Sequence, residues 1–249
     1  MGDENLDSFP GTPAFRTTRW SEIQAAGSGS PASARAALES LCAAYGYPLY
    51  AFLRRDGHDV EAARDLVQGF FASFLARDDL ARITPEGGRF RSYLLGGLRH
   101  FVSNERERER ALKRGGGVTP LSLDTLVESA EERYAVEPAD DENPERLYER
   151  RFAVAVLEAT LARLAEEEER AGRGDTFAAM RPFLTGDPPA AGYTEVALAL
   201  GKTAGALKVA AHRLRKRFRA ALLEEVARHV ERPQDVEDEL LHLFRVLGE

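Results

Sequence analysis

The residues with the clearest chemical potential are cationic side chains in the C-terminal third of the chain. From Gly201 to Arg219 the sequence contains seven lysines and arginines and no acidic residue, although the whole chain has a formal net charge of -7. A concentrated basic segment inside an acidic protein is typical of a surface that contacts phosphate groups. The chemistry expected from this segment is therefore non-covalent recognition of a polyanion.

Two predicted helices position these cations. Thr194 is predicted to cap a short helix, Gly201 to supply a tight turn, and Thr203 to cap a second, longer helix. Apolar residues recur at three- and four-residue spacing on one inward face of the second helix: Leu207, Ala211, Leu214 and Phe218. The pattern is typical of a DNA-binding helix-turn-helix, whose second helix directs its first turn at base edges and its later arginines at the backbone. A solvated amphipathic helix with a basic face remains the alternative.

A second basic segment, residues 89–104, interleaves aromatic and cationic side chains. Phe90, Tyr93 and Phe101 alternate there with arginines and a histidine. Aromatic and basic groups side by side can grip single-stranded bases. The same pattern also results when the aromatic side chains form a core and the arginines face solvent, and the residues alone do not decide between these two interpretations.

The helix predicted after Asp59 has a broad apolar face and a polar one. Asp59 is expected to cap this helix, and Glu61, Asp65 and Gln68 lie together on the face opposite the apolar residues. An exposed row of this kind needs no special function to explain it.

Length and composition indicate a protein with a sizeable core, since 43% of its 249 residues are hydrophobic. The longest apolar runs are far shorter than a membrane span, and the first residues lack the pattern of a signal peptide. We therefore expect a cytoplasmic location without membrane insertion. Enzymatic activity is not expected, because the sequence has no P-loop and no Cys/His spacing for a metal, and no cofactor is predicted. The single cysteine, Cys42, lies on an apolar helical face and is expected to pack as a small hydrophobic side chain.

The predicted fold class is all-α, with two small helical domains joined by an acidic linker. The linker contains ten acidic residues and three arginines, so its net charge equals the -7 of the whole chain. The predicted boundaries are a flexible tail over residues 1–15, a first domain over 16–114, the linker over 115–150, a second domain with the helix-turn-helix over 151–223, and a C-terminal helical extension over 224–249. Within the first domain, Pro48 is expected to begin a new helix after one that ends at Tyr45.

A run of four glutamates, residues 166–169, closes the first helix of the second domain. Four adjacent carboxylates can in principle bind a metal ion, but no histidine or turn interrupts the run. A solvated helix end is therefore the favoured interpretation.

Three segments taken together resemble the sigma-70 superfamily of RNA polymerase sigma factors: EAARDLVQGFFASFL, RFRSYLLGGLRHFVSNER and YTEVALALGKTAGALKVAAHRLRKRFR. More narrowly, the chain looks like the compact extracytoplasmic-function (ECF)-like sigma factors over about residues 35–114 and 150–222, in a subgroup with an acidic linker and a C-terminal extension. The resemblance implies a bacterial protein that binds core RNA polymerase and directs promoter-specific transcription initiation. An anti-sigma protein or a Ser/Thr kinase is then a candidate regulatory partner.

The family's motifs imply three sets of functional residues. Docking on core polymerase would fall to Asp65, Leu66 and Gln68. Recognition of the downstream promoter element, as a single strand, would fall to Arg89, Arg91, Tyr93, Arg99, His100 and Asn104. Recognition of the upstream promoter element, as duplex DNA, would fall to Lys202, Thr203, Lys208, His212, Arg213, Arg215 and Lys216.

The chain departs from the family pattern in the aromatic-basic helix. Tyr93 stands where the family has tryptophan, Gly96 and Gly97 stand where it prefers a bulky residue, and His100 and Asn104 replace its usual Asn and Asp. The downstream base preference is therefore the least transferable property.

Two other functions stay open from the sequence. One is a helix-turn-helix regulator that binds DNA without polymerase, and the other is an adaptor that uses the acidic linker and the final helix. Opposite charges also suggest a hypothesis for control, in which the linker and the C-terminal helix cover the basic recognition helix.

Overall fold

The computed structural model describes residues 21, 31–75, 89–111, 124–137, 143–184 and 192–248. Every regular element in these residues is a helix, which confirms the predicted all-α class. The α-helices are α2 (Pro31–Arg55), α3 (Val60–Leu75), α4 (Phe90–Ala111), α5 (Asp124–Ala135), α6 (Pro144–Arg170), α7 (Gly174–Met180), α8 (Gly192–Ala199), α9 (Ala204–Ala227) and α10 (Val236–Gly248). Two short 3-10 helices, η2 (Arg181–Phe183) and η3 (Pro233–Asp235), follow α7 and precede α10. The tail predicted over residues 1–15 lies outside the described residues.

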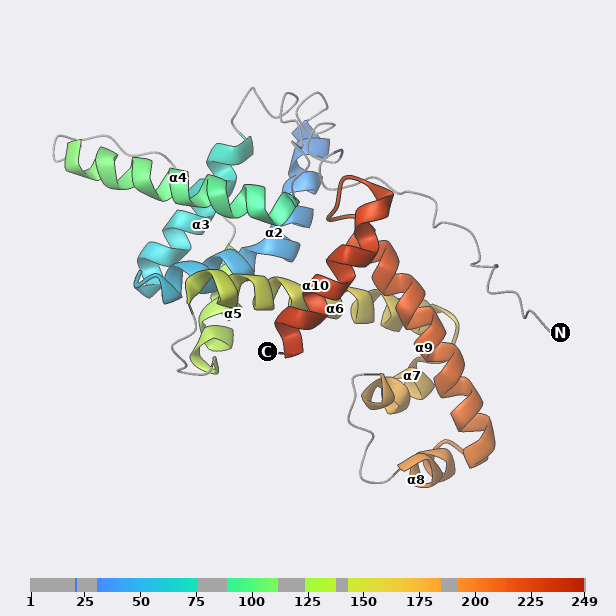
Figure 1. The fold of residues 1–249 in the computed structure, drawn as a ribbon. Coiled ribbons are helices and arrows are strands. Elements are labelled where there is room, and N and C mark those ends of the chain that lie inside the picture. The colour runs from blue at the N-terminus through green and yellow to red at the C-terminus, as the bar shows by residue number, and fades with distance from the viewer. Residues whose placement is uncertain are drawn as a thin grey trace.

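The buried side chains of the described residues gather in two hydrophobic cores. The first core joins α2, α3, α4 and the N-terminal half of α6, and it also receives Leu222 and Val226 of α9 and Leu243 of α10. The second core joins the end of α6 to α7, α8 and the part of α9 up to Ala221. Figure 1 shows α6 running through the middle of the molecule between these two groups of helices. With 27 residues, α6 is about 40 Å long and contributes to both cores.

The helix α2 is continuous over 25 residues, with Pro48 in its interior. The predicted break at Pro48 was wrong, although proline costs about 3 kcal/mol inside a helix because it removes a backbone donor. Tyr45 and Leu49, on either side of Pro48, are both fully buried. The Tyr45 ring stacks on Phe152 of α6 with centroids 5.3 Å apart, and its hydroxyl shares a 2.7 Å hydrogen bond with Nδ1 of His229. Burial of several large side chains, each worth about 1.5–3 kcal/mol, outweighs the cost of the proline.

The described C-terminal part of the predicted linker is helical and packed. Ala130 of α5 is buried in the first core. Glu131, also on α5, accepts a 2.7 Å hydrogen bond from Arg54 and another from the Tyr50 hydroxyl, both on α2. The acidic side chains of this segment therefore serve in part to fasten α5 to α2.

The start of α6 lies inside the range predicted as linker. Asn143 caps the helix, since its side-chain oxygen accepts a 2.7 Å hydrogen bond from the backbone N–H of Arg146. Leu147 and Tyr148 are fully buried in the first core. Residues 144–150 therefore form about the first two turns of a core helix.

Close packing of α3 on α4 depends on a glycine. A Cβ added to Gly69 would lie 3.1 Å from the Phe101 ring, whereas one added to Gly96 would meet no atom within 4 Å. Since glycine in a helix interior costs roughly 0.5–1 kcal/mol relative to alanine, Gly96→Ala should raise the free energy of unfolding by about that amount. Gly69→Ala should give a less stable protein than Gly96→Ala, because the ring must shift by a few tenths of an ångström. Urea unfolding of the two variants measures the difference, and equal stabilities would contradict the packing described here.

The last helix, α10, lies against α6 and the end of α9, as Figure 1 shows. Leu243 is buried in the first core, with Val236, Leu240 and Leu247 partly buried against it. This spacing confirms an amphipathic C-terminal helix, as expected from Val236, Leu240, Leu243, Phe244 and Leu247, except that Phe244 is half-exposed. None of the helices in the described part of the chain combines the length and the apolarity that a membrane crossing requires.

Candidate nucleic-acid interface

The first helix of the helix-turn-helix begins earlier than predicted. Thr194 lies inside α8 and is exposed, so its predicted capping role was wrong. The chain enters the helix at Gly192, whose φ of +63° lies in the left-handed region that glycine adopts without strain. That backbone turn starts α8 two residues before the threonine.

The turn and the second cap agree with the prediction. Gly201 has a φ of +62°, and the N–H of Lys202 donates to the Ala197 carbonyl at 2.8 Å, which closes the turn. The Thr203 hydroxyl oxygen accepts a 3.1 Å hydrogen bond from the backbone N–H of Ala206 and so caps α9. These local contacts fix the direction in which α9 leaves the turn.

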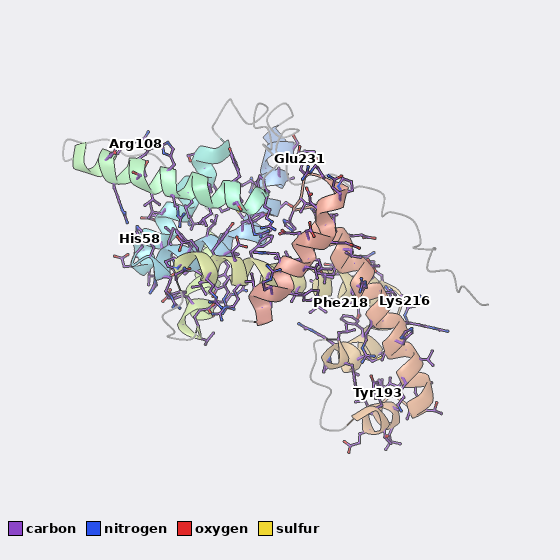
Figure 2. All side chains as sticks on the ribbon, in the orientation of Figure 1. His58, Arg108, Tyr193, Lys216, Phe218 and Glu231 are labelled. Carbon is purple, nitrogen blue, oxygen red and sulfur yellow. The ribbon has the colours of Figure 1, made fainter. Side chains whose placement is uncertain are left out.

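The two faces of α9 differ in burial as predicted. Leu207, Ala211 and Leu214 are buried in the second core. Four of the residues predicted to bind upstream DNA are exposed and form no ion pair or hydrogen bond with any described residue: Lys208, His212, Arg213 and Lys216. Figure 2 shows Lys216 and Phe218 on opposite sides of α9. We call these four residues the cationic row.

The remaining residues predicted to bind upstream DNA have partners within the protein. The Thr203 side chain is occupied as the cap, and Nζ of Lys202 donates to the Thr176 hydroxyl at 3.1 Å. Arg215 donates from Nε to the Phe183 carbonyl at 3.3 Å and from its terminal nitrogen to the Tyr193 hydroxyl at 2.9 Å. These bonds tie α9 to α8 and η2, so the exposed Arg215 guanidinium already has partners within the protein.

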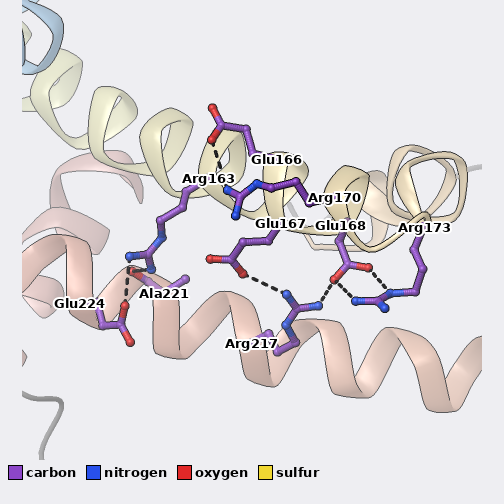
Figure 3. Close-up of polar contacts among 9 residues, drawn as sticks. All are labelled: Arg163, Glu166, Glu167, Glu168, Arg170, Arg173, Arg217, Ala221 and Glu224. Carbon is purple, nitrogen blue, oxygen red and sulfur yellow. Dashed lines mark hydrogen bonds and ion pairs between the residues drawn. The ribbon is translucent and has the colours of Figure 1, made fainter.

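The glutamate run at the end of α6 is an ion-pair cluster, as Figure 3 shows. Glu168 is buried and pairs with Arg173 at 2.7 Å and also with Arg217 of α9. Glu167 pairs with Arg217 at 3.0 Å. The predicted solvated helix end was therefore wrong for Glu168. A buried carboxylate needs a partner of opposite charge. Glu167 and Glu168 neutralise Arg217, which therefore adds little to the positive charge of the α9 surface.

The aromatic residues of α4 belong to the first core. Phe90 is fully buried, and the Tyr93 ring packs against it with centroids 6.2 Å apart. Phe101 meets the Phe70 ring of α3 at 6.0 Å. Of the two interpretations left open for this segment, core packing therefore accounts for the aromatic side chains, including Tyr93.

Three of the residues predicted to bind the downstream promoter element face outward from the same helix. His100 and Asn104 are exposed, and Arg99 is half-exposed. Arg99 pairs with Glu145 and lies over the Phe52 ring, with 5.3 Å between the guanidinium carbon and the ring centroid. These residues are accessible to a ligand along α4.

Arg91, by contrast, is buried. Only 1% of its side chain is exposed, its Nε lies 2.5 Å from a Glu149 oxygen, and its terminal nitrogen pairs with Glu239 of α10. Arg89 lies 2.7 Å from the second oxygen of Glu239. Burial lowers the pKa of Arg91, and the nearby carboxylate of Glu149 partly offsets this shift. The structure corrects the DNA-binding role predicted for Arg91, since its guanidinium holds α4, α6 and α10 together.

His242 completes this group, which we call the arginine–glutamate cluster: Arg89, Arg91, Glu149, Glu239 and His242. Its Nε2 lies 3.1 Å from the Glu149 oxygen. Burial lowers the pKa of His242, and the nearby guanidinium of Arg91 lowers it further, although Glu149 acts in the opposite direction. The neutral imidazole is therefore favoured beside the two arginines.

A polar cavity of about 400 Å³ lies beside Arg89. Its lining is mainly acidic, with Glu231 and Asp235 from the segment before α10 and Asp238 and Glu239 from the first turn of α10, although Arg232 also lines it. Carboxylates at this position repel a phosphate backbone. The hypothesis that the linker and the C-terminal helix cover the basic face of α9 was wrong for the C-terminal helix, because α10 packs at the other end of α9 and the cationic row is exposed. For the linker it stays untested over residues 115–123 and 138–142, which lie outside the described residues.

The residues predicted to dock on polymerase divide between surface and core. Asp65 is exposed on α3 and forms no ion pair with any described residue. Gln68 is half-buried, whereas Leu66 packs against the first core. A protein partner at this face would meet Asp65 and part of Gln68.

Sequence reasoning missed the acidic members of the arginine–glutamate cluster and one exposed apolar residue, Val209. A signal for Glu239 was present, because it falls between Val236 and Leu243 on the apolar spacing of the last helix. A charged residue on a buried stripe requires a partner of opposite charge. The sequence contains no local sign of which arginine provides it.

No group of three His, Cys, Asp or Glu side chains among the described residues lies close enough together to hold a metal ion. Cys42 is buried, which raises the pKa of its thiol to about 12 and disfavours the reactive thiolate. Comparisons of the chain with protein-family models, with curated proteins and with solved structures found no significant match. Its function must therefore be inferred from its own residues and their geometry.

Proposed function

We propose that the chain is a bacterial, ECF-like RNA polymerase sigma factor that binds core polymerase and directs promoter-specific transcription initiation in the cytoplasm. The observation that carries this proposal is the cationic row, exposed and unpaired with any described residue, on a helix that follows a capped tight turn. Phosphate groups of duplex DNA are the partners that suit such a surface. Because the chain as a whole is acidic, this basic face is where attraction to duplex DNA is concentrated.

The surface of α9 suits the upstream promoter element. A helix with an exposed, basic face fits the major groove, where side chains of its first turns reach base edges and later ones reach phosphates. Lys208 and His212 lie nearer the turn, whereas Arg213 and Lys216 continue along the helix. At the opposite end of the molecule, α4 extends away from the helix-turn-helix (Figure 1), so the two predicted DNA elements would contact separate regions.

Binding to core polymerase is proposed for the outer face of α3. Asp65 offers a charge with no ion-pair partner among the described residues, and the sequence around it carries the family resemblance. Recognition of the downstream element would then rest on Arg99, His100 and Asn104, which α4 exposes.

One observation favours a second function, a helix-turn-helix regulator that binds duplex DNA without polymerase. Arg91 is buried and Arg89 is paired with Glu239, so these two arginines do not display a single-strand binding surface. A regulator of this kind needs only the surface of α9. The two functions differ in whether Asp65 contacts another protein.

Affinity co-purification with bacterial core RNA polymerase tests the proposal. Wild type should retain polymerase, and Asp65→Arg should weaken binding by at least about tenfold, or about 1.4 kcal/mol. Glu132→Arg is the matched control, because Glu132 is an exposed acid on α5 that forms no ion pair with any described residue. Circular dichroism establishes that both variants are folded.

Duplex binding separates the two functions. A sigma factor loses polymerase but keeps duplex binding in Asp65→Arg. Failure of wild type to retain polymerase, with duplex binding intact, would support the polymerase-independent regulator. Equal loss in Asp65→Arg and Glu132→Arg would contradict the docking role of α3.

A further inference from the structure

Val209 is an exposed apolar residue in the middle of the surface proposed to bind DNA. Its exposed fraction is 53%, and it lies on the side of α9 opposite the buried Leu207, Ala211 and Leu214. The helical repeat places it next to His212 and Arg213, three and four residues further along, with Lys216 one turn beyond. The only large apolar side chain of this face is therefore surrounded by the cationic row.

Folding does not account for a valine at this position. The packing of α9 in both cores uses the opposite side of the helix. Valine also has a lower helix propensity than alanine, lysine or arginine, because its branched Cβ restricts the side chain. An exposed valine in this helix therefore lowers helix stability without adding a packing contact to either core.

The surrounding charges specify what that ligand is. Because Lys208, His212, Arg213 and Lys216 form no ion pair with any described residue, they favour a polyanion over an apolar or cationic protein surface. Within duplex DNA, the major groove displays one apolar group, the C5-methyl of thymine. One turn before Val209, Gly205 leaves open space on the same face, since a Cβ there would meet no atom within 4 Å. The base edges can therefore approach Val209 closely.

We propose that Val209 contacts the C5-methyl group of a thymine in the major groove and thereby adds sequence specificity to the surface of α9. This inference rests on the duplex binding in the proposed function. The flanking cations hold the backbone and contribute affinity to any sequence, whereas the valine side chain distinguishes thymine from the other bases.

Substitution of single methyl groups in the DNA tests this contact. Duplexes that bind the full chain are first selected from a randomised library, and each thymine is then replaced in turn by deoxyuridine, which lacks only the methyl. Wild type should lose about fourfold in affinity at one position, as expected for about 0.8 kcal/mol per buried methyl. In Val209→Ala, thymine and deoxyuridine at that position should bind equally.

Arg219→Ala is the matched control. Arg219 is exposed on α9 and forms no ion pair with any described residue. Its removal should weaken binding to both duplexes while the ratio between thymine and deoxyuridine is retained. Val209 is exposed and alanine is the better helix former, so Val209→Ala should fold at least as well as wild type.

The outcomes are distinguishable. A wild type that binds selected duplexes but discriminates at no thymine would overturn the inference and leave the proposed function standing. The same holds if Val209→Ala keeps the discrimination, since the methyl would then be read by another group. If wild type selects no duplex from the library, the proposed function and the inference both fail.

Discussion

Replacement of Glu239 by alanine is expected to lower the free energy of unfolding by about 3 to 5 kcal/mol, because it leaves a buried arginine short of a partner. Arg91 and Glu239 are each only 1% exposed, and Glu239 also neutralises Arg89. Glu149 remains as a partner for Arg91 in the variant, which favours the lower end of the range. Urea unfolding monitored by circular dichroism measures the change.

Two further variants show whether the loss comes from an unpaired charge. Glu237→Ala removes an exposed acid from the first turn of the same helix and should cost only a few tenths of a kcal/mol. The double variant Arg91→Met with Glu239→Leu removes both buried charges, and it should be more stable than Glu239→Ala. If Glu239→Ala unfolds like Glu237→Ala, the arginine–glutamate cluster does not hold α10 in place.

The second large effect is expected on DNA binding. Alanine at Lys208, Arg213 and Lys216 together should weaken duplex binding at least about a hundredfold, since each such contact contributes roughly 1 to 3 kcal/mol. Each phosphate contact also adds about 0.9 to the slope of log K against log salt, so the triple variant should show a distinctly smaller slope. Fluorescence anisotropy with a labelled duplex, titrated at several salt concentrations, measures both quantities.

Arg215→Ala is the control for this experiment, because it removes one positive charge from the same helix. Its guanidinium is hydrogen-bonded to the Phe183 carbonyl and the Tyr193 hydroxyl. We therefore expect a loss of stability of about 1 to 2 kcal/mol, with little change in the salt slope. A slope that falls by about 0.9 in Arg215→Ala would show that Arg215 contacts phosphate after all.

Features with local causes could be predicted from the sequence. The turn at Gly201 and the cap at Thr203 depend on hydrogen bonds that span at most five positions, and the structure confirms both. The inward face of α9 follows from the helical repeat. Thr194 was mistaken for a cap because Gly192 offers an equally local alternative that starts the helix earlier.

Features with long-range causes could not be predicted in this way. The helix α2 continues through Pro48 because Phe152 and His229, far along the chain, cover the Tyr45 on its buried face. Arg91 resembles a binding residue in its own segment, and only its contact with Glu149, 58 positions away, reveals a packed ion pair. The positive charge of an arginine predicts that it binds an anion. It does not predict whether that anion is a carboxylate of the same chain or a phosphate of a ligand.

Because α6 and α9 contribute to both cores, a substitution that destabilises one core also destabilises the other. Each core loses a helix it depends on if the other core opens, so the two are expected to melt as one cooperative unit. A substitution near Tyr45 or Phe152 would then increase the local opening of α9, although the charge of the α9 surface would not change. For this chain, cutting between the two groups of helices would divide helices that both groups require, and neither fragment would keep a complete core.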